Sequence, residues 1–167
     1  MSRTVPVSFG TRNLWIYDQS LAVWLVRFIE HVATLDGGSA QPLARLVGDA
    51  PCHAALGAIQ HLPLDEYVAD ENLGAFVTAA GEVSRQIRAA GPIPVDPLHA
   101  MRLDGYDLPP IVRAQSGTLD PEPIASVGDV LVALVRGELP LPPPHMWWYV
   151  GVEAEPLTIR MAGDLSG

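Results

Sequence analysis

The polar residues of the segment 21–35 form a single narrow stripe. Eleven of its fifteen residues are apolar. The four polar residues recur at the positions i, i+3, i+4 and i+7: Arg27, Glu30, His31 and Thr34. Residues at this spacing share one face of an α-helix, so the pattern predicts a helix that is buried on its other sides. We expect Asp18 to cap the start of this helix and the Asp-Gly-Gly run at 36–38 to end it.

Helical periods also run through the segments 70–90 and 124–138. In 70–90 the apolar residues follow the 3.6-residue repeat, Asp70 is the expected cap, and the Gly-Pro pair at 91–92 ends the helix. The run VLVALV within 124–138 fits either a helix or a buried strand, and we interpret it as a helix. Residues 51–63 predict a short helix bracketed by prolines.

Alternating and turn-forming patterns predict small antiparallel hairpins at about 101–108 and 147–162. In the first, an Asp-Gly pair at 104–105 favours a two-residue turn. Its register pairs Leu103 with Tyr106 on an apolar face and Arg102 with Asp107 on the other face. In the second, strand geometry sends the adjacent residues Trp147 and Trp148 to opposite faces.

These elements together predict a single globular α+β domain over residues 1–167, in which three to four helices pack with the small hairpins. A short N-terminal strand is expected at Val5 to Phe9 or at Leu14 to Tyr17. The segment 91–123 has seven prolines and is expected to be irregular apart from its hairpin. The prolines at 140–144 match a PxxP ligand, but the spacing of the nearest arginine favours a stiff spacer instead.

Composition narrows the classes of function. The net charge of -9 argues against binding to nucleic acid or to an anionic membrane surface, and it favours a basic partner. All ten basic residues are arginines, so mechanisms that need a lysine are excluded. The only cysteine is Cys52, which rules out an intramolecular disulfide and a cysteine-based zinc cluster. No membrane span is predicted, and a reducing cytoplasm is the expected location.

No motif in the sequence specifies a catalytic mechanism. There is no G-x-S-x-G, Walker A or G-x-G-x-x-G pattern, and the histidines lack metal-ligand spacing. We therefore predict no cofactor, no metal and no catalytic residue, and we lean against an enzyme.

Two groups of residues are nevertheless candidate sites. The first would bind a partner through acidic and aromatic side chains: Asp65, Glu66, Tyr67, Asp70, Glu71, His145, Trp147 and Trp148. The second would line a pocket in the proline-rich segment: His99, Arg102, Asp107 and Arg113.

Three hypotheses of function follow from these residues. The first is a small acidic protein-binding module, for example an inhibitor or immunity-type protein for a basic partner. The second is an enzyme or small-molecule binder whose site is assembled from scattered Asp, Glu, His, Arg and Trp residues. The third is a homo-oligomeric structural or assembly protein that buries the tryptophan strand.

Overall fold

A computed structural model of the chain describes residues 4–48, 61–99, 102–103, 106–107, 117–139, 146–150 and 158–161. The helices are α1 (Asp18–Thr34), α2 (Gly37–Ala40), α4 (Asp70–Ala90), α5 (Val95–His99) and α7 (Pro121–Val135), with the 3-10 helices η1 (Gln41–Leu43) and η2 (Leu64–Glu66). The strands are β1 (Thr4–Phe9), β2 (Arg12–Tyr17), β3 (Leu62–Pro63), β4 (Ile93–Pro94), β5 (Arg102–Leu103), β6 (Tyr106–Asp107), β7 (Thr118–Leu119), β8 (Met146–Val150) and β9 (Thr158–Met161). This mixture confirms the predicted α+β class.

The main sheet has the strand order β3-β1-β2-β8-β9. β1 and β2 form an antiparallel hairpin, which turns at Gly10 with φ 59°, a backbone conformation that glycine adopts without steric cost. β3 runs parallel to β1, and β8 runs parallel to β2. The N-terminal and C-terminal hairpins are therefore joined side by side into one mixed sheet.

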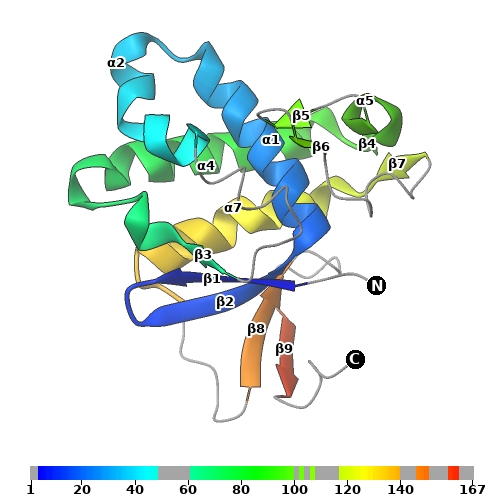
Figure 1. Cartoon of the computed structure of the whole chain (residues 1–167). Helices are drawn as coiled ribbons and strands as arrows, with labels where there is room; N and C mark the ends of the chain where they lie inside the picture. The colour runs from blue at the N-terminus through cyan, green and yellow to red at the C-terminus, as the bar shows by residue number, and fades with distance from the viewer. Residues whose placement is uncertain are drawn as a thin grey trace.

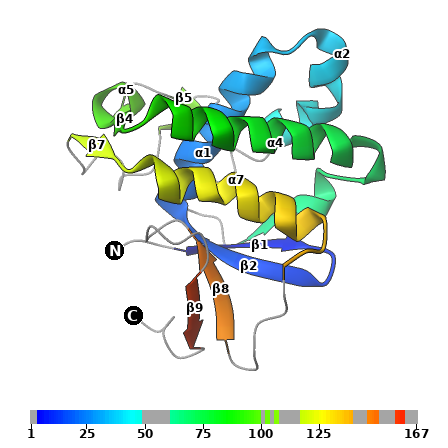
Figure 2. The same cartoon turned by 180° about the vertical axis from the view of Figure 1, so that it is seen from behind.

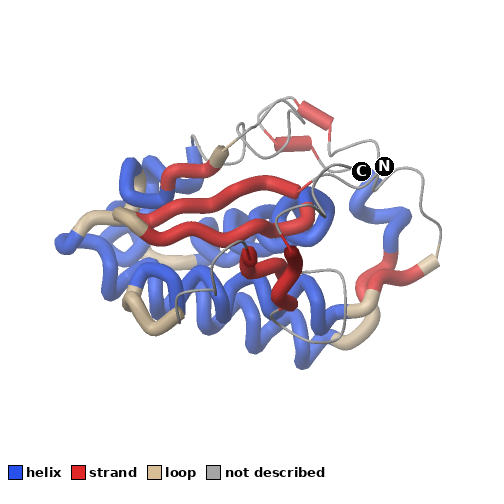
Figure 3. Tube along the Cα trace, turned by 90° about the horizontal axis from the view of Figure 1, so that it is seen from below, coloured by secondary structure: helices blue, strands red, loops and turns tan. Residues whose placement is uncertain are grey.

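The long helices all lie on one side of this sheet (Figures 1 and 2). α7 runs between α4 and the sheet and contacts β1, β2 and β8, whereas α4 packs mainly on α7 and α1. The view from below shows the strands in front of the helices (Figure 3). The inward-facing residues of β1 and β2, namely Val5, Val7, Leu14 and Ile16, are buried beneath the helices.

An aromatic cluster joins α1 to α4 in the core. The rings of Trp24 and Phe28 stack with their centroids 5.1 Å apart, and the centroids of Phe28 and Phe76 lie 5.9 Å apart. All three side chains are at most 1% exposed. Rings in this arrangement attract one another beyond the burial of their area, so the cluster stabilises the packing of the two helices.

The three long helices meet at a junction formed by Trp24, Ser84 and Gly128. The Ser84 hydroxyl donates a hydrogen bond to the carbonyl of Ala125 on α7 at 2.7 Å. A Cβ atom at Gly128 would lie 2.2 Å from Ser84 Oγ and 2.7 Å from Trp24 Nε1. A side chain at residue 128 would therefore push α7 away from α4 and α1.

The predicted long helices are confirmed, but details of their ends differ. α1 begins at Asp18, which is thus its first residue instead of its cap, and α7 begins at Pro121 behind the capping side chain of Asp120. α4 begins at Asp70, which is thus its first residue instead of its cap, and the side chain of Asn72 accepts a hydrogen bond from the backbone N–H of the cap residue Ala69. Asn72 supplies this bond because its carbonyl oxygen reaches back over the first turn.

The shorter elements were predicted less completely. Both N-terminal segments offered as alternative strands are strands, and they pair with each other. Leu62–Pro63 forms β3 and is not helical, since it adds to the edge of β1; residues 51–60 of the predicted helix 51–63 lie outside the described residues. Within 91–123 the described residues include the short elements β4, α5, β5, β6 and β7 and the start of α7. That the segment as a whole is irregular stays a prediction.

Both predicted hairpins are present. β5 pairs with β6 in the expected register, with Arg102 opposite Asp107 and Leu103 opposite Tyr106. β8 pairs with β9 across the C-terminal hairpin. The proline run 140–144 lies outside the described residues. Among the helices that the structure describes, none combines the length and apolarity needed to cross a bilayer.

Candidate functional site

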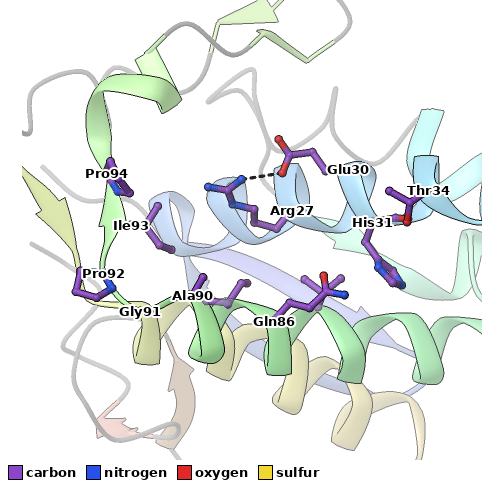
Figure 4. Close-up of a pocket in the computed structure, with 12 residues that line it drawn as sticks. Arg27, Glu30, His31, Thr34, Gln86, Ala90, Gly91, Pro92, Ile93 and Pro94 are labelled. Atoms are coloured by element: carbon purple, nitrogen blue, oxygen red, sulfur yellow. Dashed lines mark hydrogen bonds and ion pairs between the residues drawn. The ribbon is translucent and has the colours of Figure 1, made fainter.

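A cleft of about 440 Å³ lies between α1, the C-terminal half of α4 and β4 (Figure 4). Its lining residues are Arg27, Glu30, His31, Thr34, Val83, Gln86, Ile87, Ala90, Gly91, Pro92, Ile93 and Pro94. The size falls within the range of roughly 300–1,000 Å³ that is typical of small-molecule pockets.

The polar wall of the cleft is the polar stripe of α1. Its four residues face away from the buried side of the helix, where Trp24 and Phe28 pack into the core. The stripe was evident in the sequence, and the structure shows that it borders a cleft. In Figure 4 the His31 ring points from α1 toward α4.

The opposite wall and the closed end are mostly apolar. α4 contributes Val83, Ile87 and Ala90, and it ends where Gly91 turns the chain at φ 74°. Only glycine adopts that conformation readily, so this turn directs Pro92 and β4 across the end of the cleft. β4 is held in place by its pairing with β7.

The oppositely charged side chains Arg27 and Glu30 in the cleft form an ion pair. Arg27 Nη1 lies 2.8 Å from Glu30 Oε2, and these side chains are 32% and 45% exposed. Next to the lining residue Val83 on α4, Glu82 accepts hydrogen bonds from Arg85 at 2.6 and 2.8 Å and from Gln86 at 2.8 Å. These bonds from Arg85, then that from Gln86, lower the pKa of Glu82 to about 2, and the charge of His31 contributes a smaller decrease.

Several polar atoms of the cleft make no hydrogen bond within the described part of the chain. Gln86 uses its amide nitrogen on Glu82, which leaves its carbonyl oxygen available as an acceptor. The Thr34 hydroxyl donates a hydrogen bond to the backbone carbonyl of the half-buried His31 at 2.7 Å, and the ring nitrogens of His31 make none within the described residues. The cleft therefore offers both a donor and an acceptor beside an apolar wall.

The stability conferred by Glu82 is expected to depend on pH. Because its pKa is lower in the folded protein than in the unfolded chain, this contribution is complete above about pH 4.5 and is lost as the pH falls toward 2. Glu82→Gln should lower the midpoint of urea unfolding at pH 7 and have little effect near pH 2. Arg85→Gln, which removes the partner of Glu82, should show the same trend. If the midpoints of wild type and variant differ by the same amount at pH 7 and near pH 2, the pH dependence does not come from Glu82.

The cleft residues do not form a recognisable catalytic centre. No serine, cysteine or aspartate is among the described residues that line it, and the hydroxyl of Thr34 is engaged with a backbone carbonyl. Within the described ranges, no group of three or more His, Cys, Asp or Glu residues could hold a metal ion. The described lining residues provide hydrogen-bonding groups on one side and apolar side chains on the other.

No protein-family model, curated protein or solved structure matches the chain. The function of the cleft must therefore be inferred from its own residues and their contacts.

The acidic residues expected to bind a partner lie away from the cleft. Asp65 and Glu66 are in η2, Asp70 and Glu71 open α4, and all four are exposed. Tyr67, which we expected to supply contact area, is only 6% exposed because its side chain packs into the core. The segment therefore presents carboxylates to solvent without an aromatic anchor.

The tryptophan strand is not beside this acidic segment. η2 follows β3 at one edge of the sheet, whereas β8 is separated from β3 by β1 and β2. Trp148 is half-buried and packs against the core, and the structure describes Trp147 only by its backbone pairing with Arg160. His145 lies outside the described residues.

The residues predicted to form a pocket are only partly described. His99 ends α5, and Arg102 and Asp107 are paired in the β5-β6 hairpin. Arg113 lies outside the described residues. The sequence signal that did mark the cleft was the polar stripe of α1, which we had interpreted only as the exposed face of a buried helix.

Proposed function

We propose that this protein binds a small organic molecule in the cleft between α1 and α4. The observation that supports this most directly is the cleft itself: a cavity of about 440 Å³ with a mostly apolar wall facing a polar one. Binding sites for small molecules combine apolar walls with a few polar groups that fix the orientation of the ligand. Of our three hypotheses, the small-molecule binder is the one that this geometry supports.

The residues favour binding over catalysis. A nucleophilic mechanism needs a nucleophile in contact with a base that is itself oriented by a third group. The described lining residues offer His31 and Glu30 as titratable groups of suitable chemistry, but Glu30 is paired with Arg27. No Ser or Cys stands beside either of them in the cleft.

A pair of neighbouring substitutions tests this proposal. Ala90 lines the cleft and Ala89 does not, although both are exposed residues of the last turn of α4. A fragment library screened by thermal shift should yield ligands that raise the Tm of the wild type. At one hundred times its Kd, a ligand stabilises the folded state by about 2.7 kcal/mol, or roughly 5–10 °C for a chain of this size.

The same ligands should raise the Tm of Ala89→Phe but not that of Ala90→Phe, because only the second ring occupies the cleft. If ligands stabilise both variants equally, they bind elsewhere. A screen that finds no ligand for the wild type at millimolar concentrations would also contradict the proposal.

Association with a basic protein stays a prediction that rests on the net charge and the exposed carboxylates at 65–71. Self-association through the tryptophan strand likewise stays a prediction. Neither depends on the cleft, so a ligand there is compatible with both.

A further inference from the structure

We infer that the ligand of the cleft is uncharged, largely apolar, and carries hydrogen-bonding groups along one edge. This inference rests on the proposed function and adds the chemical class of the ligand. It follows from three properties of the lining residues: the pairing of their charges, the division of the cleft into apolar and polar walls, and the atoms that remain available for hydrogen bonds.

The two oppositely charged side chains that line the cleft are already paired with each other. The Arg27 guanidinium lies 2.8 Å from the Glu30 carboxylate, and farther along α4 the Arg85 guanidinium lies 2.6 Å from the Glu82 carboxylate. A carboxylate brought to Arg27 would also meet Glu30, and an ammonium group brought to Glu30 would meet Arg27. Either ion would lose hydration without gaining an unopposed counter-charge, which is unfavourable.

The apolar part of the cleft requires apolar ligand surface. Val83, Ile87 and Ile93 are buried, and Pro92 and Pro94 stand with Ile93 at the closed end (Figure 4). None of these five side chains has a hydrogen-bonding group. The part of the ligand that lies against these five side chains must therefore be hydrocarbon or the face of a ring.

The remaining polar atoms match a neutral polar edge. The carbonyl oxygen of Gln86 is free to accept a hydrogen bond, and the two ring nitrogens of His31 are available for further hydrogen bonds. A primary amide, a lactam or an alcohol supplies complementary groups without a charge. His31 and Thr34 lie at the end of the cleft away from the prolines, so the polar edge of the ligand is expected there (Figure 4).

The test compares three versions of each ring that differ in charge. Naphthalene, biphenyl and indole rings carrying a primary amide, a carboxylate or a methylammonium group are titrated into the wild-type protein at pH 7.5. Binding is followed by protein-observed NMR and isothermal calorimetry. We expect the amide of each ring that binds to be at least tenfold tighter than its carboxylate, and tighter than its ammonium form. Ala90→Phe should abolish this binding, and Ala89→Phe should retain it.

The outcomes separate the two proposals. If a carboxylate or ammonium form binds as tightly as the amide in the wild type and loses binding in Ala90→Phe, the cleft is a ligand site and the inferred neutrality is wrong. If no form binds, or if Ala90→Phe and Ala89→Phe retain binding equally, the proposed function fails and the inference fails with it.

Variants in which the cleft should favour a charged ligand provide a second test. Glu30→Gln leaves the guanidinium of Arg27 without its partner, so the affinity of the carboxylate relative to the amide should rise at least tenfold. Arg27→Met should produce the corresponding gain for the ammonium form. Ratios that stay unchanged in both variants would show that this ion pair does not set the preference, and would overturn the inference.

Discussion

Replacing Phe28 with alanine is expected to lower the free energy of unfolding by about 4 kcal/mol. Phe28 is fully buried and lies between the rings of Trp24 and Phe76 at 5.1 and 5.9 Å. The substitution removes the burial of a whole ring, leaves a cavity between α1 and α4, and deletes both ring contacts. Urea unfolding followed by circular dichroism measures the loss.

The stability losses of two related substitutions can be compared with that of Phe28→Ala. Phe9→Ala makes the same change at a half-buried position of β1 that packs on the edge of the core, so its cost should be less than half as large. Phe28→Leu keeps most of the volume and should cost about 1 to 2 kcal/mol. A loss below about 2 kcal/mol for Phe28→Ala would mean that the ring does not hold the two helices together.

Gly128→Ala is expected to cost about 3 kcal/mol, because it adds a methyl group where three helices meet. The new Cβ would lie 2.2 Å from Ser84 Oγ, 2.7 Å from Trp24 Nε1 and 3.0 Å from the backbone oxygen of Ala80. None of these atoms is at the end of a long, flexible side chain, so the helices themselves must separate. Thermal and urea unfolding of the purified variant measure the effect.

Two comparisons distinguish this steric effect from a general effect of alanine. Gly81→Ala on α4 adds the same methyl group where nothing lies within 4 Å, and it should raise stability by about 0.5 to 1 kcal/mol through helix propensity. Combining Ser84→Ala with Gly128→Ala removes the shortest contact and should recover part of the loss. A Gly128→Ala variant as stable as the wild type would show that the junction is loosely packed.

The long helices could be predicted because their signals are local. In α1, α4 and α7 the apolar repeat extends over four or more turns, and the ends are marked by residues such as Gly91. The β5-β6 register followed from one turn and two cross-strand pairs. The parallel pairings of β3 with β1 and of β8 with β2 had no such signal, because each joins segments that are far apart in the chain.

Only one wall of the cleft could be predicted from the sequence. The α1 stripe of Arg27, Glu30, His31 and Thr34 predicts an exposed helix face, but not what lies opposite it. The opposite wall comes from α4 and from the turn at Gly91, and tertiary packing alone brings these next to α1. The burial of Tyr67 was missed for a similar reason, since a tyrosine among four acids has the pattern of an exposed residue.

The pairing of β2 with β8 has a consequence for how the protein is made. Trp15 lies beside Tyr149, and Ile16 beside Val150, so the two strands are well over a hundred residues apart in the chain. At ordinary rates of translation, β2 leaves the ribosome on the order of ten seconds before its neighbour is synthesised. During that interval its edge has unpaired backbone groups that another nascent chain could bind. Mispairing of β2 is therefore most expected between nascent chains on one polysome.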